Sequence, residues 1–281
     1  MSRKLSAADT ALIDELATLG VDVSVRQLER WRAAGLISTT RAWGGTGRGG
    51  SSSQYDEGTA NLVEELVDVL AEERSLDLAA LILFARGYQI SEDGLRAAYA
   101  NAYEALASFG AQGGDPDGWT RAQSISERRR YTSHPVVRAW RKRIRERPER
   151  GPVSRETRAI GASVIHVLQT GDPIQDEDAA FVAQASGVGE IAESAELTMD
   201  FADTLADLSF PVLAQTVESA SVDELAQARD SLKHLSRFLV QASDVFPDPD
   251  DLLVALVAPA LVQIMRIAGP WWEDLLPSQP E

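Results

Sequence analysis

Apolar side chains recur at every third or fourth position along most of the chain, and this spacing limits the fold more than any other feature. Leu12, Leu16 and Leu19 form one such stripe, and a longer one from Leu225 to Phe246 extends over roughly three heptads. Side chains three and four residues apart share one face of a helix, whereas strand residues alternate between two faces. Strand-like alternation is convincing only within residues 39–54. The sequence therefore predicts an all-α fold with one small β-hairpin.

Residues that begin and end helices divide the chain into segments. Four serines precede apolar stripes and can each cap a helix with the side-chain oxygen. They are Ser6, Ser24, Ser91 and Ser221. Gly35 and Gly87 follow helical stripes, as glycine does where a helix ends. We expect helices over residues 25–34, 56–74, 76–85, 91–109 and 135–147, and a last helix that is capped by Asp248 and begins at Pro249.

Charge is distributed unevenly along the chain. The 27 basic and 43 acidic residues give a net charge of −16; residues 1–150 hold 21 of each, which leaves 6 basic and 22 acidic residues in 151–281. A neutral half joined to an acidic half is typical of a protein in which one part meets nucleic acid and the other does not.

Composition argues against several classes of site. The chain has no cysteine, which excludes disulfides and thiolate metal sites. The three histidines, His134, His166 and His234, are far apart in sequence, which argues against a histidine metal centre or a catalytic triad. Acidic runs at 176–178 and 248–251 coincide with expected helix starts, where they complement the helix dipole. We expect no metal, no cofactor and no enzymatic activity.

The most apolar segment, Leu252 to Ala268, contains three residues that a membrane span disfavours: Pro259, Gln263 and Arg266. It is also shorter than the roughly 20 apolar residues that a span requires. We interpret it as a buried core helix. The first 19 residues lack the apolar run of a signal peptide, so we expect a soluble, cytoplasmic protein.

The segment between Ser24 and Gly35 is the most informative about function. Both ends are specified, so it predicts a short helix that follows a preceding helix after a tight turn. At about 100° per residue its apolar side chains face one way and two arginines face the other; these are Leu28 and Trp31 against Arg26 and Arg30. Two short helices with a basic outer face are typical of a helix-turn-helix. An ordinary helical hairpin with solvated arginines is the alternative.

The next segment, residues 39–54, is rich in glycine and serine and also contains Trp43 and two arginines. A solvated linker would explain the glycines, but neither Trp43 nor the immediate return to a helical pattern after Tyr55. A β-hairpin wing explains both. Arg41 and Arg48 could then reach phosphates or a minor groove.

The order of these elements resembles the MerR family of winged-helix regulators. The matching residues are Val23, Ser24, Arg26, Leu28, Trp31, Gly35, Leu36 and Ile37, with Arg41 and Tyr55 at the start and end of the wing. The resemblance covers about residues 10–88. Glu29 and Arg30 stand where the family has arginine and tyrosine, and the wing is longer and richer in glycine.

The resemblance implies a division of the chain into three parts. Residues 1–90 would form a winged helix-turn-helix, residues 91–110 a linking and dimerisation helix, and residues 119–281 a helical effector or interaction domain. The residues expected to contact double-stranded DNA are Ser24, Arg26, Gln27, Arg30, Arg41, Arg48 and Tyr55. Those expected at the homodimer contact are Leu95, Tyr99, Tyr103 and Leu106.

A second basic region lies at residues 121–150, with eleven basic and three acidic residues. Its candidate phosphate contacts are Arg128, Arg129, Arg130, Arg141 and Arg145. They could equally form a solvated face that pairs with the acidic half.

These features predict a transcription regulator that binds operator DNA as a homodimer. Its C-terminal half would bind a small molecule or a protein such as RNA polymerase. One alternative is a DNA-binding protein of recombination or segregation. Another is an interaction protein whose acidic half binds a basic partner.

Overall fold

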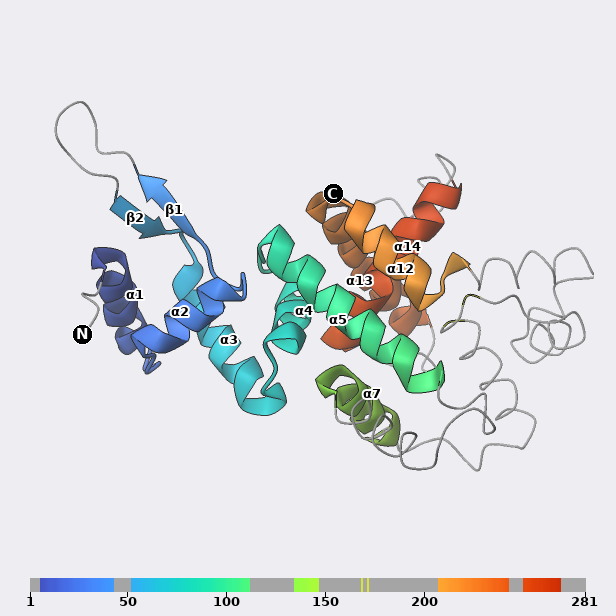
Figure 1. Ribbon diagram of the computed structural model, residues 1–281, viewed down its shortest axis with the longest axis horizontal. Coiled ribbons are helices and arrows are strands. Elements are labelled where there is room, and N and C mark those ends of the chain that lie inside the picture. The colour runs from blue at the N-terminus through green and yellow to red at the C-terminus, as the bar shows by residue number, and fades with distance from the viewer. Residues whose placement is uncertain are drawn as a thin grey trace, which may run out of the picture. The chain divides into compact units, whose positions relative to one another are not determined.

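The computed structural model describes residues 6–42, 52–111, 134–146, 168, 171, 207–242 and 250–268 (Figure 1). These residues are mostly helical, and their strands form one antiparallel pair. The prediction of a mainly helical protein is therefore confirmed. The chain divides into two compact units, Met1–Ala98 with Asp248–Leu256, and Tyr99–Pro247 with Val257–Glu281. The first unit thus includes a segment close to the C-terminal end, which the division expected from the sequence leaves in the last domain.

The first unit contains most of the elements that concern function. They are α1 (Ala7–Thr18), α2 (Val25–Ala33), β1 (Thr39–Ala42), β2 (Ser52–Tyr55), α3 (Thr59–Glu73), α4 (Leu76–Arg86), and the first residues of α5 (Glu92–Ala111) and α14 (Asp251–Ala268). β2 lies beside α1, and both α1 and α4 pack on α3 (Figure 1). The core between them is mainly aliphatic, and Leu16, Leu28, Leu66 and Leu83 are completely buried in it.

Both ends of α2 are set by local hydrogen bonds, as the sequence predicts. The Ser24 amide donates to Gln27 Oε1 at 2.9 Å, and the Gln27 amide donates back to the Ser24 hydroxyl. At the other end Gly35 takes a left-handed conformation with φ of 71°, and the Leu36 amide donates to the Trp31 carbonyl oxygen at 2.9 Å. The length of α2 is therefore fixed by its own sequence.

Gly35 also lies against the start of α5. The Ser91 amide donates to the Gly35 carbonyl oxygen at 3.1 Å, and a Cβ atom on Gly35 would come within 2.9 Å of the Gly94 Cα atom. Glycine is therefore required at position 35 for two reasons, the left-handed backbone and the close approach of a second chain segment. The end of α2 is held against α5 by this contact.

Two helices begin later than the sequence predicts. α3 starts at Thr59 rather than at residue 56, because Gly58 adopts a left-handed conformation and the Thr59 hydroxyl donates to the Asp56 carbonyl oxygen at 2.7 Å. α14 starts at Asp251, and its cap is Asp250 rather than Asp248, since the Asp250 carboxylate accepts from the Leu253 amide at 3.0 Å. In both places several polar residues could cap, and the spacing alone does not choose between them.

The second unit contains α7 (Pro135–Glu146), α12 (Phe210–Ser219), α13 (Val222–Ala242) and the remaining parts of α5 and α14. The ring of Tyr103 stacks on Tyr99 and on Phe210, with 5.9 Å between centroids in each pair. Tyr99 and Tyr103 are 0% and 1% exposed, and Leu95 and Leu106 are buried as well. The four side chains that are expected at a dimer contact are thus buried within one chain, because the apolar stripe of α5 packs into the core of that same chain.

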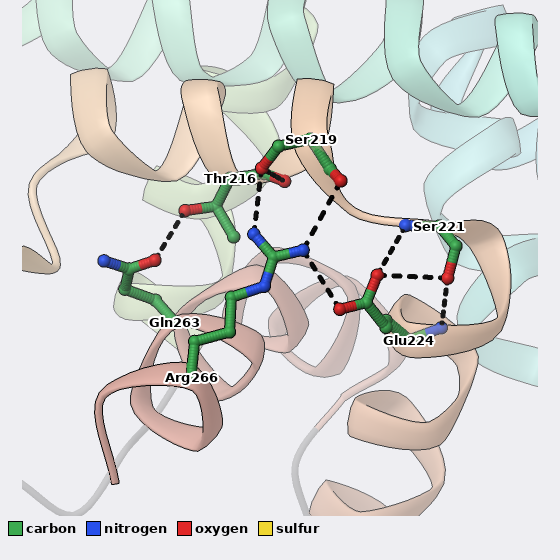
Figure 2. A network of polar contacts seen from close by, with 6 residues as sticks. All are labelled: Thr216, Ser219, Ser221, Glu224, Gln263 and Arg266. Atoms are coloured by element: carbon green, nitrogen blue, oxygen red, sulfur yellow. Dashed lines mark hydrogen bonds and ion pairs between the residues drawn. The ribbon is translucent and has the colours of Figure 1, made fainter. Parts of the chain in front are cut away.

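A polar network joins three helices of the second unit (Figure 2). It consists of Thr216 and Ser219 of α12, Ser221 and Glu224 at the start of α13, and Gln263 and Arg266 of α14. The Arg266 guanidinium donates to the Ser219 hydroxyl at 2.8 Å and to Glu224 Oε1 at 3.0 Å. Glu224 also accepts from the Ser221 amide, which confirms the predicted capping box. Arg266 therefore donates hydrogen bonds to the last residue of α12 and to a glutamate in the first turn of α13. This role is structural.

In the ranges that the structure describes, no helix has both the length and the apolar character needed to cross a bilayer. The most apolar segment forms α14, in which Leu252, Val254 and Ala255 are buried, as expected of a core helix.

Candidate nucleic-acid interface

Two arginines lie on the outward face of α2. Arg26 and Arg30 are one helical turn apart, and both are exposed. In the described part of the chain no ion pair engages either guanidinium. Leu28 and Trp31, on the opposite face, are buried. The helix thus presents two planar cationic groups about 6 Å apart along its axis, and such groups bind phosphate oxygens or guanine edges in bidentate fashion.

The third arginine of α2 has a different role. Arg32 Nη1 lies 3.2 Å from Asp9 Oδ1, and the Tyr55 hydroxyl donates to the same oxygen at 2.7 Å. The Arg32 guanidinium also lies 6.0 Å from the centre of the Tyr55 ring. These three residues, which we call the brace, come from α1, α2 and β2. The brace ties α2 to the preceding helix and to the hairpin.

The electrostatics of the brace are those of an ionised, buried carboxylate. Asp9 is 5% exposed, and burial alone would raise its pKa. The hydrogen bonds from Tyr55 and Ser6 and the charge of Arg32 outweigh burial, so that the pKa of Asp9 is lowered from its ordinary value of 3.8. Burial, and then the hydrogen bond to Asp9, raises the pKa of the Tyr55 hydroxyl well above 10. At neutral pH the brace holds an anion, a cation and a neutral donor.

Three of the residues that are expected to contact DNA form hydrogen bonds within the chain instead. The Tyr55 hydroxyl is bound to Asp9, so Tyr55 acts in this structure as an internal support rather than as a donor to phosphate. Ser24 and Gln27 are exposed, but their side-chain oxygens form the cap of α2. The amide nitrogen of Gln27 is the group of this pair that can still donate to a ligand.

The β-hairpin that the sequence predicts is present. β1 and β2 are antiparallel, with Thr39 opposite Tyr55 and Arg41 opposite Ser53. The Ser38 hydroxyl donates to the Asp56 carboxylate at 3.2 Å, which closes the base of the hairpin. Arg48 lies outside the described residues, as does the side chain of Arg41.

Acidic residues gather on another part of the first unit. A hollow of about 400 Å³ lies between α1 and the turn that joins β2 to α3, and its charged lining residues are Glu15, Asp56 and Glu57. Carboxylates in such a hollow repel phosphate. The lining of the hollow is therefore anionic, whereas the outward face of α2 presents the guanidinium groups of Arg26 and Arg30.

The second basic region is described only in part. Arg128, Arg129 and Arg130 lie outside the described residues, whereas Arg141 and Arg145 belong to α7, with side chains that are not described. The described residues contain no group of three or more histidine, aspartate or glutamate side chains placed to hold a metal ion.

Two residues of the brace, Asp9 and Arg32, are not among the predicted site residues, although the signal for each is present in the sequence. Asp9 stands three residues before Leu12 and seven before Leu16, inside the apolar stripe of α1, where a carboxylate requires partners. Arg32 stands four residues after Leu28 and so shares its inward face. A charge on an apolar stripe predicts that the side chain has an internal partner, but the spacing does not say which residue that partner is.

Comparison of the chain with protein-family models, curated proteins and solved structures finds no match.

Proposed function

We propose that this chain is a DNA-binding transcription regulator of MerR-like type. In this proposal α1, α2 and the β1–β2 hairpin form a winged helix-turn-helix, and α2 enters the major groove with Arg26 and Arg30 toward the bases and phosphates. The observation that carries the proposal is the contrast among the arginines of α2. Arg32 is held inside by the brace, whereas Arg26 and Arg30 are exposed and without an ion pair in the described residues.

The rigidity of α2 supports a role in recognition. Its start is capped by Ser24, its end is set by Gly35, and its inward side is held by Leu28, Trp31 and the brace. A side chain that reads a base edge must be held in place before binding, because ordering it at the moment of contact costs affinity. A helix of this size fits the major groove of B-DNA.

The remaining parts of the proposal concern assembly and regulation. Two copies would present two α2 helices to two half-sites. Residues 151–281, which hold the excess of acidic residues, repel phosphate and so suit a role away from DNA as an effector or protein-binding region. The localisation that fits this activity is the cytoplasm.

Selection from a random duplex pool tests the proposal. The intact chain is used to enrich bound duplexes, and fluorescence anisotropy then compares its affinity for the enriched duplex and for a scrambled one. Arg26→Ala and Arg30→Ala should each weaken binding to the enriched duplex by about 1–3 kcal/mol, or roughly 5- to 150-fold. Arg74→Gln, which removes an exposed arginine from the turn after α3, is the matched control and should leave the affinity unchanged. Equal affinities of parent and Arg26→Ala would refute the assignment of α2.

A further inference from the structure

The helix α7 has a basic face that the proposed reading of DNA by α2 does not use. Its twelve residues include five basic residues and one acidic residue. Four of the basic residues stand at positions i, i+3, i+4 and i+7, which lie within about 100° of each other around a helix. They are Arg138, Arg141, Lys142 and Arg145, and we call them the α7 basic face. They extend over about 10 Å of helix axis.

The described side chains of this face are turned to solvent. Arg138 and Lys142 are exposed, and in the described residues no ion pair engages either of them. Like charges three and four residues apart repel and weaken a helix. This repulsion between the four cations is relieved when a polyanion binds to them.

The opposite face of α7 decides which polyanion fits. Val136, Val137 and Ala139 are 0%, 1% and 3% exposed, so the apolar side of the helix is already packed within the chain. A helix that binds a lipid surface inserts its apolar side into the bilayer, and in α7 the described residues of that side are already packed within the chain. Binding to a phosphate backbone needs only the cations. The geometry thus favours nucleic acid over a membrane.

We infer that the α7 basic face is a second, sequence-independent contact for the phosphate backbone of duplex DNA. The inference rests on the proposed function in that both surfaces share this ligand. The two surfaces differ in what they contribute: α2 supplies preference for a sequence, and α7 supplies affinity that depends strongly on salt and not on sequence. Phosphate contacts of this kind position a protein on DNA without reading it.

The test measures how the affinity of the intact chain for a 30-base-pair duplex of random sequence depends on salt. The slope of log affinity against log salt concentration changes by about 0.9 for each phosphate contact. A variant with Arg138→Gln, Arg141→Gln, Lys142→Gln and Arg145→Gln should therefore have a slope smaller in magnitude by about 3–4. It should keep the parent's ratio of affinities for enriched and scrambled duplexes.

Two control variants make the result specific to these cations. Replacing Arg138, Arg141 and Arg145 with lysine keeps every charge and should keep the parent's slope. Replacing Arg74, Arg96, Arg229 and Lys233 with glutamine removes four charges elsewhere and should change the slope by less than one. Thermal melting of each variant establishes that it is folded.

Several results would overturn the inference. One is an unchanged slope in the folded α7 variant, and another is failure of the parent to bind the random duplex. A lowered melting temperature with an unchanged slope would assign the face to the chain's own acidic residues. Loss of binding to vesicles that contain phosphatidylserine, with DNA binding unchanged, would assign it to a membrane. The proposed recognition of a DNA sequence by α2 is tested separately. It is refuted if the double variant with Arg26→Ala and Arg30→Ala keeps the parent's preference for the enriched duplex.

Discussion

The neighbouring positions of α2 show how one residue type takes opposite roles. Arg30 and Arg32 are two residues apart, and the helical period turns one to solvent and the other to Asp9. The chemistry of the guanidinium is the same in both places. Its environment decides whether it is available to a ligand or belongs to the fold.

Paired substitutions of these arginines should separate stability from DNA binding. Arg32→Ala removes the cation from a buried carboxylate and should lower the free energy of unfolding by about 1 kcal/mol, a value moderated by the partial exposure of the guanidinium. Arg26→Ala should leave that free energy within about 0.5 kcal/mol of the parent and weaken DNA binding. Urea unfolding and anisotropy measure the two quantities. An unchanged stability of Arg32→Ala would show that the ion pair between Arg32 and Asp9 contributes nothing.

Asp9 should make the stability of the first unit sensitive to acid. Its pKa in the folded chain is lowered from 3.8, so its ionised form stabilises the fold at neutral pH. That contribution is present above the pKa of the unfolded chain and is lost as the pH falls through the lower, folded pKa. Asp9→Asn should cost about 1–3 kcal/mol at neutral pH and less below pH 4. Melting curves of both proteins between pH 2.5 and 7 measure this, and parallel curves over that range would contradict it.

At the scale of elements, the junction of α2 and α5 is set by Gly35. Gly20 provides a matched comparison, because it also has a positive φ, of 78°, but a Cβ atom there would meet nothing within 4 Å. Gly20→Ala should therefore cost only the backbone strain, about 1 kcal/mol. Gly35→Ala adds a clash with Ser91 and Gly94 and should cost clearly more. Equal losses of stability would show that α5 can move away at no cost.

Local elements could be predicted from the sequence because their signals are local. The capping box of Ser24, the left-handed Gly35 and the hairpin after it all follow from residues a few positions apart. The brace could not be read this way, since Asp9 and Tyr55 are 46 residues apart and no local pattern pairs them. The face of α2 was therefore predictable, and what holds it in place was not.

The C-terminal segment illustrates the same limit over a longer range. Arg86 of α4 donates to Asp251 of α14 at 2.9 Å, 165 residues along the chain, and also pairs with Glu65 of α3. Charge and periodicity assign Asp251 to the acidic half, whereas the contacts place it in the first unit. A contact between two residues so far apart in sequence depends on the topology of the whole chain, and neither composition nor helical spacing specifies that topology.

At the scale of the whole molecule, the burial of the α5 stripe changes how a dimer should be tested. Tyr99 and Leu106 lie in the core, so an aspartate at either position would unfold the chain and say nothing about association. Sedimentation of the parent is the informative experiment. Under the proposed function it should be a dimer at micromolar concentration when bound to the enriched duplex. One protomer on that duplex would contradict the use of two half-sites.

The absence of cysteine from the chain allows the most direct test of α2 as the surface that meets DNA. Ala33→Cys places a single thiol on the exposed face of α2, three residues after Arg30, and keeps every arginine. Ala71→Cys places one at an exposed position of α3 and is the matched control. Each thiol is labelled with a benzophenone maleimide and irradiated with the enriched duplex. We predict cross-linking to DNA from position 33 and little from position 71. Efficient cross-linking from position 71, with none from position 33, would contradict the account.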